Sequence, residues 1–441
     1  MDWIPQVIFA MLLVTAVGIF AKNVKHILSN IQLGRPLDRS DQQNKRWENM
    51  FRIALGQSEM VKRPVAGILH IIVYIGFILI NLELVEIILD GLLGTHRLFA
   101  PYLGFFYSVL IGSFEILAFL VLVSVCVFWL RRNVLRLQRF WKEEMKGWPK
   151  LDADLILYFE IILMGLFLSM NATDALLQQL GSGNYQQAGY FPISQFLVPL
   201  FLDFSEGQLI ILERTFWWAH IIGIFVFLNY LYYSKHLHIL LAFPNTFYAN
   251  LRPKGAFPNN PTVTGEVKLM MDPNADPFAS TATEEAPEKF GASDVTDLSW
   301  VQLMNAYTCT ECGRCTSVCP ANQTGKKLSP RKIMMDTRDR LTELGKQKRK
   351  QGEQRELDNK TLLDDYITRE ELWACTSCNA CTQACPVDID PLSIIMDMRQ
   401  YLVMEQSAAP SDLNAMMSNI ENNGAPWPFN NQDRLLWTQE N

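Results

Sequence analysis

The 441-residue sequence has few charged residues, and basic residues do not dominate among them. Asp, Glu, Lys and Arg make up 19% of the chain, below the usual level of about 25%. So low a charge in a chain of this length argues against disorder and against a wholly soluble protein. The formal net charge of −6 excludes a strongly basic nucleic-acid-binding protein, so we expect no nucleic-acid partner.

Other absences narrow the possible function. The cysteines are not scattered as in a disulfide-stapled secreted protein, because eight of the nine lie in two tight groups toward the C-terminus. The sequence has no glycine-rich nucleotide-binding loop and no flavin signature. Its first apolar segment lacks the basic start and the small-residue cleavage site of a signal peptide. What remains is an apolar N-terminal half and a polar, cysteine-bearing C-terminal half.

Five apolar segments are long enough to cross a bilayer, which takes about 20 residues per helix. They predict a membrane domain over 1–250, with helices near 3–21, 65–89, 103–130, 154–171 and 215–242. Lys and Arg concentrate in the loops that follow the first and third segments, and the positive-inside rule places such loops in the cytoplasm. We therefore expect a multi-pass protein of the bacterial cytoplasmic (inner) membrane, with its N-terminus outside and its C-terminal half in the cytoplasm.

Three histidines in these segments predict redox-cofactor ligands, because single histidines in membrane helices are usually functional. His70 lies about 10 Å into the second helix, at the depth expected for His238, so the two can hold a haem b between them. His220 precedes His238 by five helical turns and about 27 Å, and it marks an outer haem or quinone level. His236 should point away from the haem. The alternative for each ring is a hydrogen-bonded core histidine.

Two runs around these histidines resemble a known family. The run HIIGIFVFLNYLYYSKHLH, from His220 to His238, resembles the last helix of the nitrate reductase gamma-subunit family of membrane cytochromes b. The run HIIVYIGF from His70 resembles that family's second helix. The resemblance implies five helices, a cytoplasmic C-terminus and pairing of His70 with His238. The family has another histidine ten residues after the first, where this chain has Ile80, so we expect one haem b, with two as the alternative.

Acidic residues also lie within the apolar segments. Ionised carboxylates are costly in lipid, so each must be paired, hydrated or protonated. One use of such groups is proton transfer to a quinone by general acid–base chemistry. The alternative is a structural hydrogen bond between helices. We predict a menaquinone and proton-transfer site formed by Glu83, Glu86 and Glu115, while Glu160 is a fourth buried acid.

The two cysteine groups both fit C-x2-C-x2-C-x3-C-P, the pattern of bacterial two-cluster ferredoxins. In that pattern the first three thiolates bind one [4Fe–4S] cluster and the fourth reaches the other cluster. Two four-cysteine zinc sites are the alternative, but zinc does not need the C-x3-C-P ending. The predicted ligand sets are Cys309, Cys312, Cys315 and Cys385 for the first cluster, and Cys375, Cys378, Cys381 and Cys319 for the second.

The predicted fold class is mainly α, a five-helix transmembrane cytochrome-b-like bundle followed by an α-helical ferredoxin domain with two [4Fe–4S] clusters. A proline-rich linker is expected over 251–295, the dicluster domain over 296–406 and a partner-docking tail over 407–441. Between the cysteine groups we expect a helix from Ser329-Pro330 and another near Thr368. The alternative for the tail is that it folds back on the ferredoxin domain.

The segment ELWACTSCNACTQACPVDIDPLSIIMDMRQYLV resembles the dicluster module of heterodisulfide-reductase-type proteins. It is most similar to membrane oxidoreductases that pass electrons from electron-transfer flavoprotein to menaquinone, as is the tail segment PSDLNAMMSNIENNGAPW. Those proteins continue into two cysteine-rich CCG domains, whereas this sequence stops at Asn441. The resemblance therefore implies a separate cytoplasmic CCG-domain iron–sulfur partner, with electron-transfer flavoprotein as a further partner.

Together these features predict an oxidoreductase subunit that is bound to the membrane and works with partner subunits. It would pass electrons between the cytoplasmic partner and menaquinone through two [4Fe–4S] clusters and haem b. A quinol-oxidising subunit that feeds a heterodisulfide-reductase-like enzyme would use the same parts in reverse. A membrane redox sensor is a third reading, but the sequence contains no kinase, DNA-binding or other output module.

Overall fold

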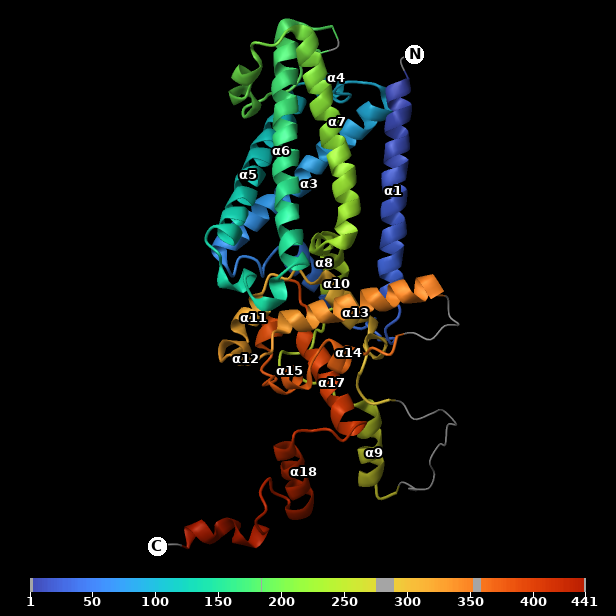
Figure 1. Ribbon diagram of the computed structural model, residues 1–441, viewed down its shortest axis with the longest axis vertical. Coiled ribbons are helices and arrows are strands. Elements are labelled where there is room, and N and C mark those ends of the chain that lie inside the picture. The colour runs from blue at the N-terminus through green and yellow to red at the C-terminus, as the bar shows by residue number, and fades with distance from the viewer. Residues whose placement is uncertain (1–2, 184, 275–288, 352–357, 440–441) are drawn as a thin grey trace.

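The computed structural model describes residues 3–183, 185–274, 289–351 and 358–439 (Figure 1). No β-strand occurs in these ranges, which confirms the mainly α fold. Five helices are long and apolar enough to cross a membrane, as predicted, and we call them the membrane bundle. They are α1 (Ile4–Ile31), α3 (Pro64–Leu93), α5 (Phe105–Asn133), α6 (Trp148–Leu180) and α7 (Glu206–Tyr230).

Local sequence signals set the ends of these helices. Pro64 occupies the first turn of α3, where a missing backbone N–H costs no hydrogen bond. Gly94 ends the same helix at φ +73°, a left-handed conformation that glycine adopts without steric cost. Ser205 and Gln208 form a capping box at the start of α7. The outer faces of the bundle are apolar, as the 58% exposure of Ile68 illustrates, and a bilayer would cover them.

The helices of the bundle form a partly open arrangement (Figure 1). Helix α6 packs against α5 and α7, α3 packs against α5, and α1 packs against α3 and α7. Phe9 of α1 is fully buried and its ring lies 5.6 Å from that of Trp217 of α7. Such aromatic contacts fix the position of α1, which otherwise exposes most of its surface.

The expected single helix over 215–242 is wrong. Helix α7 starts earlier, at Glu206, and ends at Tyr230; two 3₁₀ turns follow, and a separate helix, α8 (His238–Phe247), starts at His238. Ser234 between the turns is extended, and its hydroxyl accepts the backbone N–H of His236 at 3.0 Å. Asp152 of α6 accepts the N–H of Lys235 at 3.1 Å. These two side chains replace the helical hydrogen bonds and hold the break.

The C-terminal half, which we call the cysteine-bearing half (described residues of 289–439), is a set of shorter helices below the bundle in Figure 1. Helix α13 starts at Pro330, and Thr368 caps α15 through a capping box with Glu371, so both helices expected between the cysteine groups are confirmed. The helices are α10 (Trp300–Thr308), α11 (Arg314–Val318), α12 (Pro320–Gln323), α13 (Pro330–Gln351), α14 (Leu362–Asp365), α15 (Arg369–Trp373), α16 (Ala380–Gln383) and α17 (Pro391–Met404).

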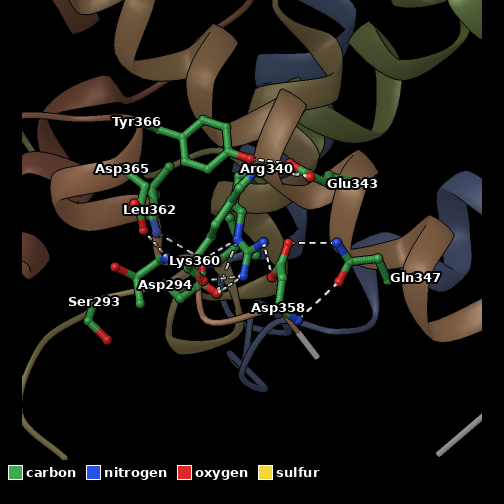
Figure 2. Close-up of polar contacts among 12 residues, drawn as sticks. Ser293, Asp294, Arg340, Glu343, Gln347, Asp358, Lys360, Leu362, Asp365 and Tyr366 are labelled. Carbon is green, nitrogen blue, oxygen red and sulfur yellow. Dashed lines mark hydrogen bonds and ion pairs between the residues drawn. The ribbon is translucent and has the colours of Figure 1, made fainter. Parts of the chain in front are cut away.

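A buried arginine ties the insertion between the cysteine groups to the start of this half. Arg340 of α13 is 1% exposed, and its guanidinium binds Asp294 and Asp358, each at 2.8 Å. Figure 2 shows the guanidinium between these carboxylates, with Gln347 reaching Asp358 from the same helix. Two paired carboxylates satisfy a buried charge that would otherwise be costly.

Two other boundaries differ from the sequence expectation or extend it. The predicted linker 251–295 contains a helix, α9 (Pro261–Met271), whose start is capped by the Asn260 side chain accepting from Val263 at 3.0 Å. Ala292 and Val295 are buried in the cysteine-bearing half, so the folded part begins before residue 296. Residues 275–288 of the predicted linker lie outside the described residues.

The tail projects away from the rest of the chain in Figure 1. It contains α18 (Ser411–Asn423), which buries no residue, and a 3₁₀ helix, η9 (Asn431–Thr438). Trp437 is 73% exposed. Beyond Ala408, which packs against the core of the cysteine-bearing half, the described tail extends away from that half; its role in docking a partner stays a prediction. The remaining short elements lie in loops: α2 (Gln43–Met50), η1 (Phe51–Leu55), α4 (Ala100–Leu103), η2 (Gln138–Phe140), η3 (Glu143–Met145), η4 (Ser194–Phe196), η5 (Val198–Phe201), η6 (Leu231–Tyr233), η7 (Lys235–Leu237) and η8 (Val295–Asp297).

Hydrogen bonds hold the cysteine-bearing half against one end of the bundle. The Asn30 amide of α1 donates to the Tyr307 hydroxyl at 2.7 Å. Arg331 of α13 donates to Glu144, in the loop between α5 and α6, at 2.7 Å. Because these contacts come from the end of α1 and from the loop between α5 and α6, they fix the cysteine groups relative to the ends of the membrane helices.

Candidate functional site

The first cysteine group and the last cysteine of the second group line one cavity. Cys309, Cys312 and Cys315 lie on the loop from α10 into α11, and Cys385 arrives from the loop after α16. Gly313 between them has φ +70°, and a Cβ there would meet the Arg331 guanidinium, so the loop needs glycine. Four thiolates around one cavity are the donor set of a [4Fe–4S] cluster.

The other cysteines form a second group nearer the surface. Cys378 is exposed, and the backbone N–H of Ser377 donates to the Cys375 sulfur at 3.4 Å. Burial raises the pKa of the Cys381 thiol to about 12, and the nearby thiols Cys375 and Cys319 add to that rise. Cys319, from the first motif, thus lies beside the second trio, in the arrangement that crossed ligation requires. The assignment of ligands to clusters stays a prediction.

The side chains that could bind metal do not converge on one point in the described residues. Among the residues that the structure describes, no three His, Cys, Asp or Glu side chains form a group able to bind one ion. Structural zinc sites need four ligands at about 2.0–2.3 Å from one ion. The described residues therefore show no preformed site with the geometry of the zinc alternative.

Charged side chains connect the first cysteine group with the bundle. Glu311, between Cys309 and Cys312, is 3% exposed and accepts from Arg338 of α13 at 2.8 Å. The second oxygen of its carboxylate pairs with the ammonium group of Lys235, in the break after α7. The first group is therefore the one that faces the membrane helices.

His70 of α3 and His238 at the start of α8 face each other. Their ring centres are 6.4 Å apart, with the ring planes at 40°. A metal–imidazole bond of about 2 Å on each side would place the centres about 6 Å apart. Nδ1 of His238 donates to the Lys235 carbonyl at 3.1 Å, which leaves Nε2 for a metal. Nδ1 of His70 is buried without a partner.

These two residues are a donor pair that could hold a haem b. Burial lowers the pKa of His238, which favours the neutral imidazole that binds a metal. When bound, the haem would supply a one-electron redox centre. The structure brings together the two histidines that the sequence analysis paired, and their role as haem ligands stays a prediction.

His236 was expected to point away from the haem, but its ring lies next to that of His238. Its ring lies edge-on to His238 at 5.4 Å, and on the other side it lies 5.5 Å from Phe227 of α7. The expectation assumed a continuous helix, whereas the break at Ser234 brings the two histidines to the same side. A series of adjacent rings thus leads from His238 into the bundle.

Two of the three predicted proton-transfer acids are occupied by hydrogen bonds. Glu86 accepts from the Tyr107 hydroxyl and from the Phe99 backbone, each at 2.8 Å. Glu115 accepts from the Asn171 amide at 3.1 Å and from the backbone of Ile193 at 2.9 Å. These contacts fit the structural alternative, in which the acids hold helices and loops together.

The sequence analysis missed the arginine at the centre of this network. Arg97 is buried and donates to Asp174 at 2.7 Å and to Asn171 at 3.0 Å. It also donates to Tyr107 at 3.2 Å. The available signal was that Arg97 is the single Lys or Arg in its predicted loop, while Asp174 follows closely after the predicted segment 154–171.

Glu83, by contrast, has no partner for one carboxylate oxygen. It is 4% exposed, and its Oε2 makes no hydrogen bond. It lines a mostly apolar cavity between α3, α5, α6 and α7, together with Glu160, His220 and Phe227. Nδ1 of His220 donates to the Leu163 carbonyl at 3.0 Å. Ile80, at the position of the missing histidine, is part of the same wall.

Comparison with known proteins agrees with the cysteine geometry. Residues 308–389 match the family model of the 4Fe-4S dicluster domain. This stretch contains both cysteine groups and the α13 insertion between them. The match supports iron–sulfur clusters as cofactors of the chain. No solved structure matches the chain.

Curated relatives extend the similarity over the membrane bundle. The chain is 30% identical over 98% of its length to a probable iron-sulfur-binding oxidoreductase, FadF, of Bacillus subtilis. It is 26% identical over 92% of its length to EtfAB:quinone oxidoreductase of Syntrophomonas wolfei. A probable membrane-anchored ferredoxin of Chromohalobacter salexigens is 28% identical over 36% of the chain.

The chain spans 60%, 55% and 25% of those three proteins, respectively. Their names describe oxidoreductases and a membrane-anchored ferredoxin, in line with the five apolar helices and the dicluster match. Together these findings support an iron–sulfur electron-transfer subunit of a membrane oxidoreductase.

Proposed function

We propose that the chain is the membrane subunit of a quinone-linked oxidoreductase, passing electrons between a cytoplasmic CCG-type iron–sulfur partner and menaquinone. The observation that carries this proposal is the position of Lys235. Its carbonyl accepts from His238, the candidate haem ligand, and its ammonium group pairs with Glu311 in the first cysteine group. One residue thus touches both candidate redox centres, so they are adjacent.

The order of the sites supports a route from the aqueous side into the bilayer. When bound, two [4Fe–4S] clusters and haem b supply one-electron steps. The exposed Cys378 makes the second cysteine group the point of access for a soluble partner. The first group lies between it and His238, and the adjacent rings of His236 and Phe227 continue toward the cavity.

The cavity beside Phe227 fits the head group of a quinone. Its apolar walls suit a flat ring, and polar groups sit at Glu83 and His220. The Nε2 of His220 is free to accept a proton, because its Nδ1 proton is held by the Leu163 carbonyl. Among the described residues, neither Glu83 nor Glu160 of the same wall accepts a hydrogen bond. Reduction of the quinone to the quinol takes two electrons from the partner and two protons, which these side chains can relay.

The direction of electron flow is proposed from the similarity to EtfAB:quinone oxidoreductase. In this direction electrons from an electron-transfer flavoprotein reach the CCG-type partner, then this chain, then menaquinone. The membrane is the cytoplasmic (inner) membrane of a bacterium, with the cysteine-bearing half inside. Quinol oxidation that feeds a heterodisulfide-reductase-like enzyme is the second candidate, since the same residues serve both directions.

The test is reduction of the haem in the purified full chain by a menaquinol analogue. We expect rapid reduction in the wild type and a rate at least tenfold lower in Glu83→Gln, because general acid–base groups contribute about 10²–10⁴-fold. Dithionite should reduce both proteins equally. Glu206→Gln is the matched control, because Glu206 is exposed at the start of α7.

Each result has a distinct meaning. A wild-type haem that the quinol analogue does not reduce would contradict the quinone-linked function. A Glu83→Gln variant that reacts like the wild type would leave that function standing but remove the cavity as its site. A CCG-domain protein that co-purifies with the chain supports the proposed partner, whereas a response regulator in its place supports the sensor reading.

A further inference from the structure

A pocket lined by five cations opens where the membrane bundle meets the cysteine-bearing half. It lies between the first turn of α3, the last turn of α5, the loop around η2, and helices α11 and α12. The described residues that line it include no Asp or Glu. The cations are Lys62, Arg63, Arg131, Arg139 and Lys142.

Most of this positive charge is not neutralised within the protein. In the described ranges, the ion pairs engage only one of the five cations, Lys62, which pairs with Glu59 at 2.6 Å. Nε of Arg139 is buried and has no hydrogen-bond partner. An anion that entered the pocket would therefore meet several cations that form no ion pair within the described residues.

The opposite wall supplies neutral hydrogen-bonding groups from the cysteine-bearing half. Thr316, Ser317, Asn322 and Gln323 of α11 and α12 line this side. The Ser317 hydroxyl accepts from Arg63 at 2.9 Å, so the two walls already touch. A ligand here would contact both halves of the chain at once.

The surface next to the pocket is apolar and faces the expected bilayer. Val65 of α3 lines the pocket and is 56% exposed, and Leu130, near the end of α5, is 45% exposed. Helices α3 and α5 pack together beside it. The pocket lies at the ends of two membrane-spanning segments, which is the depth of the lipid head groups. A ligand that matches both the basic pocket and the apolar surface beside it has a phosphate group and acyl chains.

We propose that this pocket binds an anionic phospholipid, such as phosphatidylglycerol or cardiolipin, with its phosphate among Arg63, Arg139 and Lys142. Its acyl chains lie along the exposed apolar faces of α3 and α5. Basic pockets at the ends of membrane helices bind such head groups. The lipid joins the bundle to the cysteine-bearing half beside the first cysteine group. The inference goes beyond the electron route and depends only on the five helices crossing a bilayer.

The experiment uses the purified full chain in a neutral detergent after lipid removal. Native mass spectrometry counts bound lipid, and thermal unfolding is followed with added phosphatidylglycerol, phosphatidylcholine or inorganic phosphate. We expect retention of about one anionic lipid per chain and a higher melting temperature with phosphatidylglycerol alone. Equal stabilisation by phosphatidylcholine, or by inorganic phosphate, would overturn the proposal, since the first shows no selectivity for charge and the second shows a simple ion site.

Two variants that each remove two positive charges distinguish a specific lipid site from the general attraction of basic loops to membranes. Arg139→Gln with Lys142→Gln removes two cations from the pocket. Lys22→Gln with Lys25→Gln removes two exposed cations from α1, whose residue Asn30 also touches the cysteine-bearing half. We expect at least tenfold weaker retention of phosphatidylglycerol in the first variant and wild-type retention in the second.

Equal loss in the two variants would overturn the proposal, because it would show a diffuse electrostatic effect. Iron content and the cluster spectrum report whether the pocket variant is folded. If the double substitution lowers the iron content, the single substitution Lys142→Gln takes its place, since the Lys142 side chain makes no hydrogen bond within the described residues. Unchanged lipid retention in that folded variant and in Arg139→Gln would also overturn the site.

Discussion

The ammonium group of Lys235 lies between the carboxylates of Asp152 and Glu311. It pairs directly with Glu311 and is 3.7 Å from Asp152, and it also donates to the Pro149 carbonyl at 2.7 Å. Burial lowers the pKa of Lys235, while Glu311 and Asp152 act in the opposite direction. The buried Lys235 ammonium group therefore links three parts of the chain: α6, the break after α7 and the first cysteine group.

Replacing Lys235 by Met should destabilise the contact between the bundle and the first cysteine group. Removal of one partner from a buried ion pair costs about 3–5 kcal/mol, because the other charge stays buried. We expect a lower unfolding midpoint and an altered EPR signal of the first cluster, with Lys235→Arg closer to wild type. Lys268→Met, on the exposed face of α9, is the control. An unchanged midpoint and EPR signal would show that Lys235 is not a link.

The histidine geometry predicts one haem b per chain. His70→Ala or His238→Ala should abolish the haem, because each removes one of the two adjacent histidines that would hold it. His220→Ala should retain it, since His220 lies in the cavity with Glu83. A pyridine haemochrome assay measures the haem content. Two haems per wild-type chain would show that His220 and another residue together hold a second haem.

Crossed ligation predicts which cluster each cysteine supports. Iron should be about eight per chain from two [4Fe–4S] clusters, plus the haem iron. Cys319→Ser should damage the cluster of the second trio, because Cys319 lies beside Cys375 and Cys381. Cys126→Ser in α5 is the control and should keep full iron content. Loss of the EPR signal of the first trio in Cys319→Ser would rule out the crossed arrangement.

The exposed tail is predicted to dock the separate CCG-type subunit. Trp427, Phe429 and Trp437 are 45%, 65% and 73% exposed, and large aromatic residues are favoured as interface anchors. Deletion of 424–441 should leave haem and clusters intact and release the partner on a sizing column. The control replaces Asn414 and Asn422 by Ala, on the exposed part of α18. A complex that survives the deletion would show that the anchor lies elsewhere.

Arg340 provides a stability test that is independent of the cofactors. Arg340→Met leaves Asp294 and Asp358 without the guanidinium that binds both, and should cost about 3–5 kcal/mol. Arg369→Met breaks an exposed pair with Asp364 and should cost no more than about 1 kcal/mol. Denaturant unfolding of the full chain measures both. Equal effects would mean that burial of Arg340 has no energetic consequence.

The parts of the site that depend on local spacing were predictable. The cysteine motifs are local patterns, so the dicluster match falls on the expected segment. His70 and His238 could be paired because hydrophobic length sets the depth of a residue in the bilayer. The five apolar helices were predictable for the same reason.

The parts that depend on contacts between helices were not predictable. The break at Ser234 is held by Asp152, a residue of another helix, and no local pattern reports such a partner. The same holds for Arg97, which organises Glu86 indirectly through Tyr107. Glu86 and Glu115 accept hydrogen bonds, whereas the described residues give Glu83 none. Only the packed structure reveals this difference.

The cavity formed by Cys309, Cys312, Cys315 and Cys385 has a consequence for biogenesis. Its wall is complete only after the ribosome has synthesised α13 and α16, which lie between Cys315 and Cys385 in the chain. The membrane helices emerge long before that point and can enter the bilayer without metal. With the proposed ligand set and topology, iron would therefore be delivered to a chain that is already anchored in the membrane.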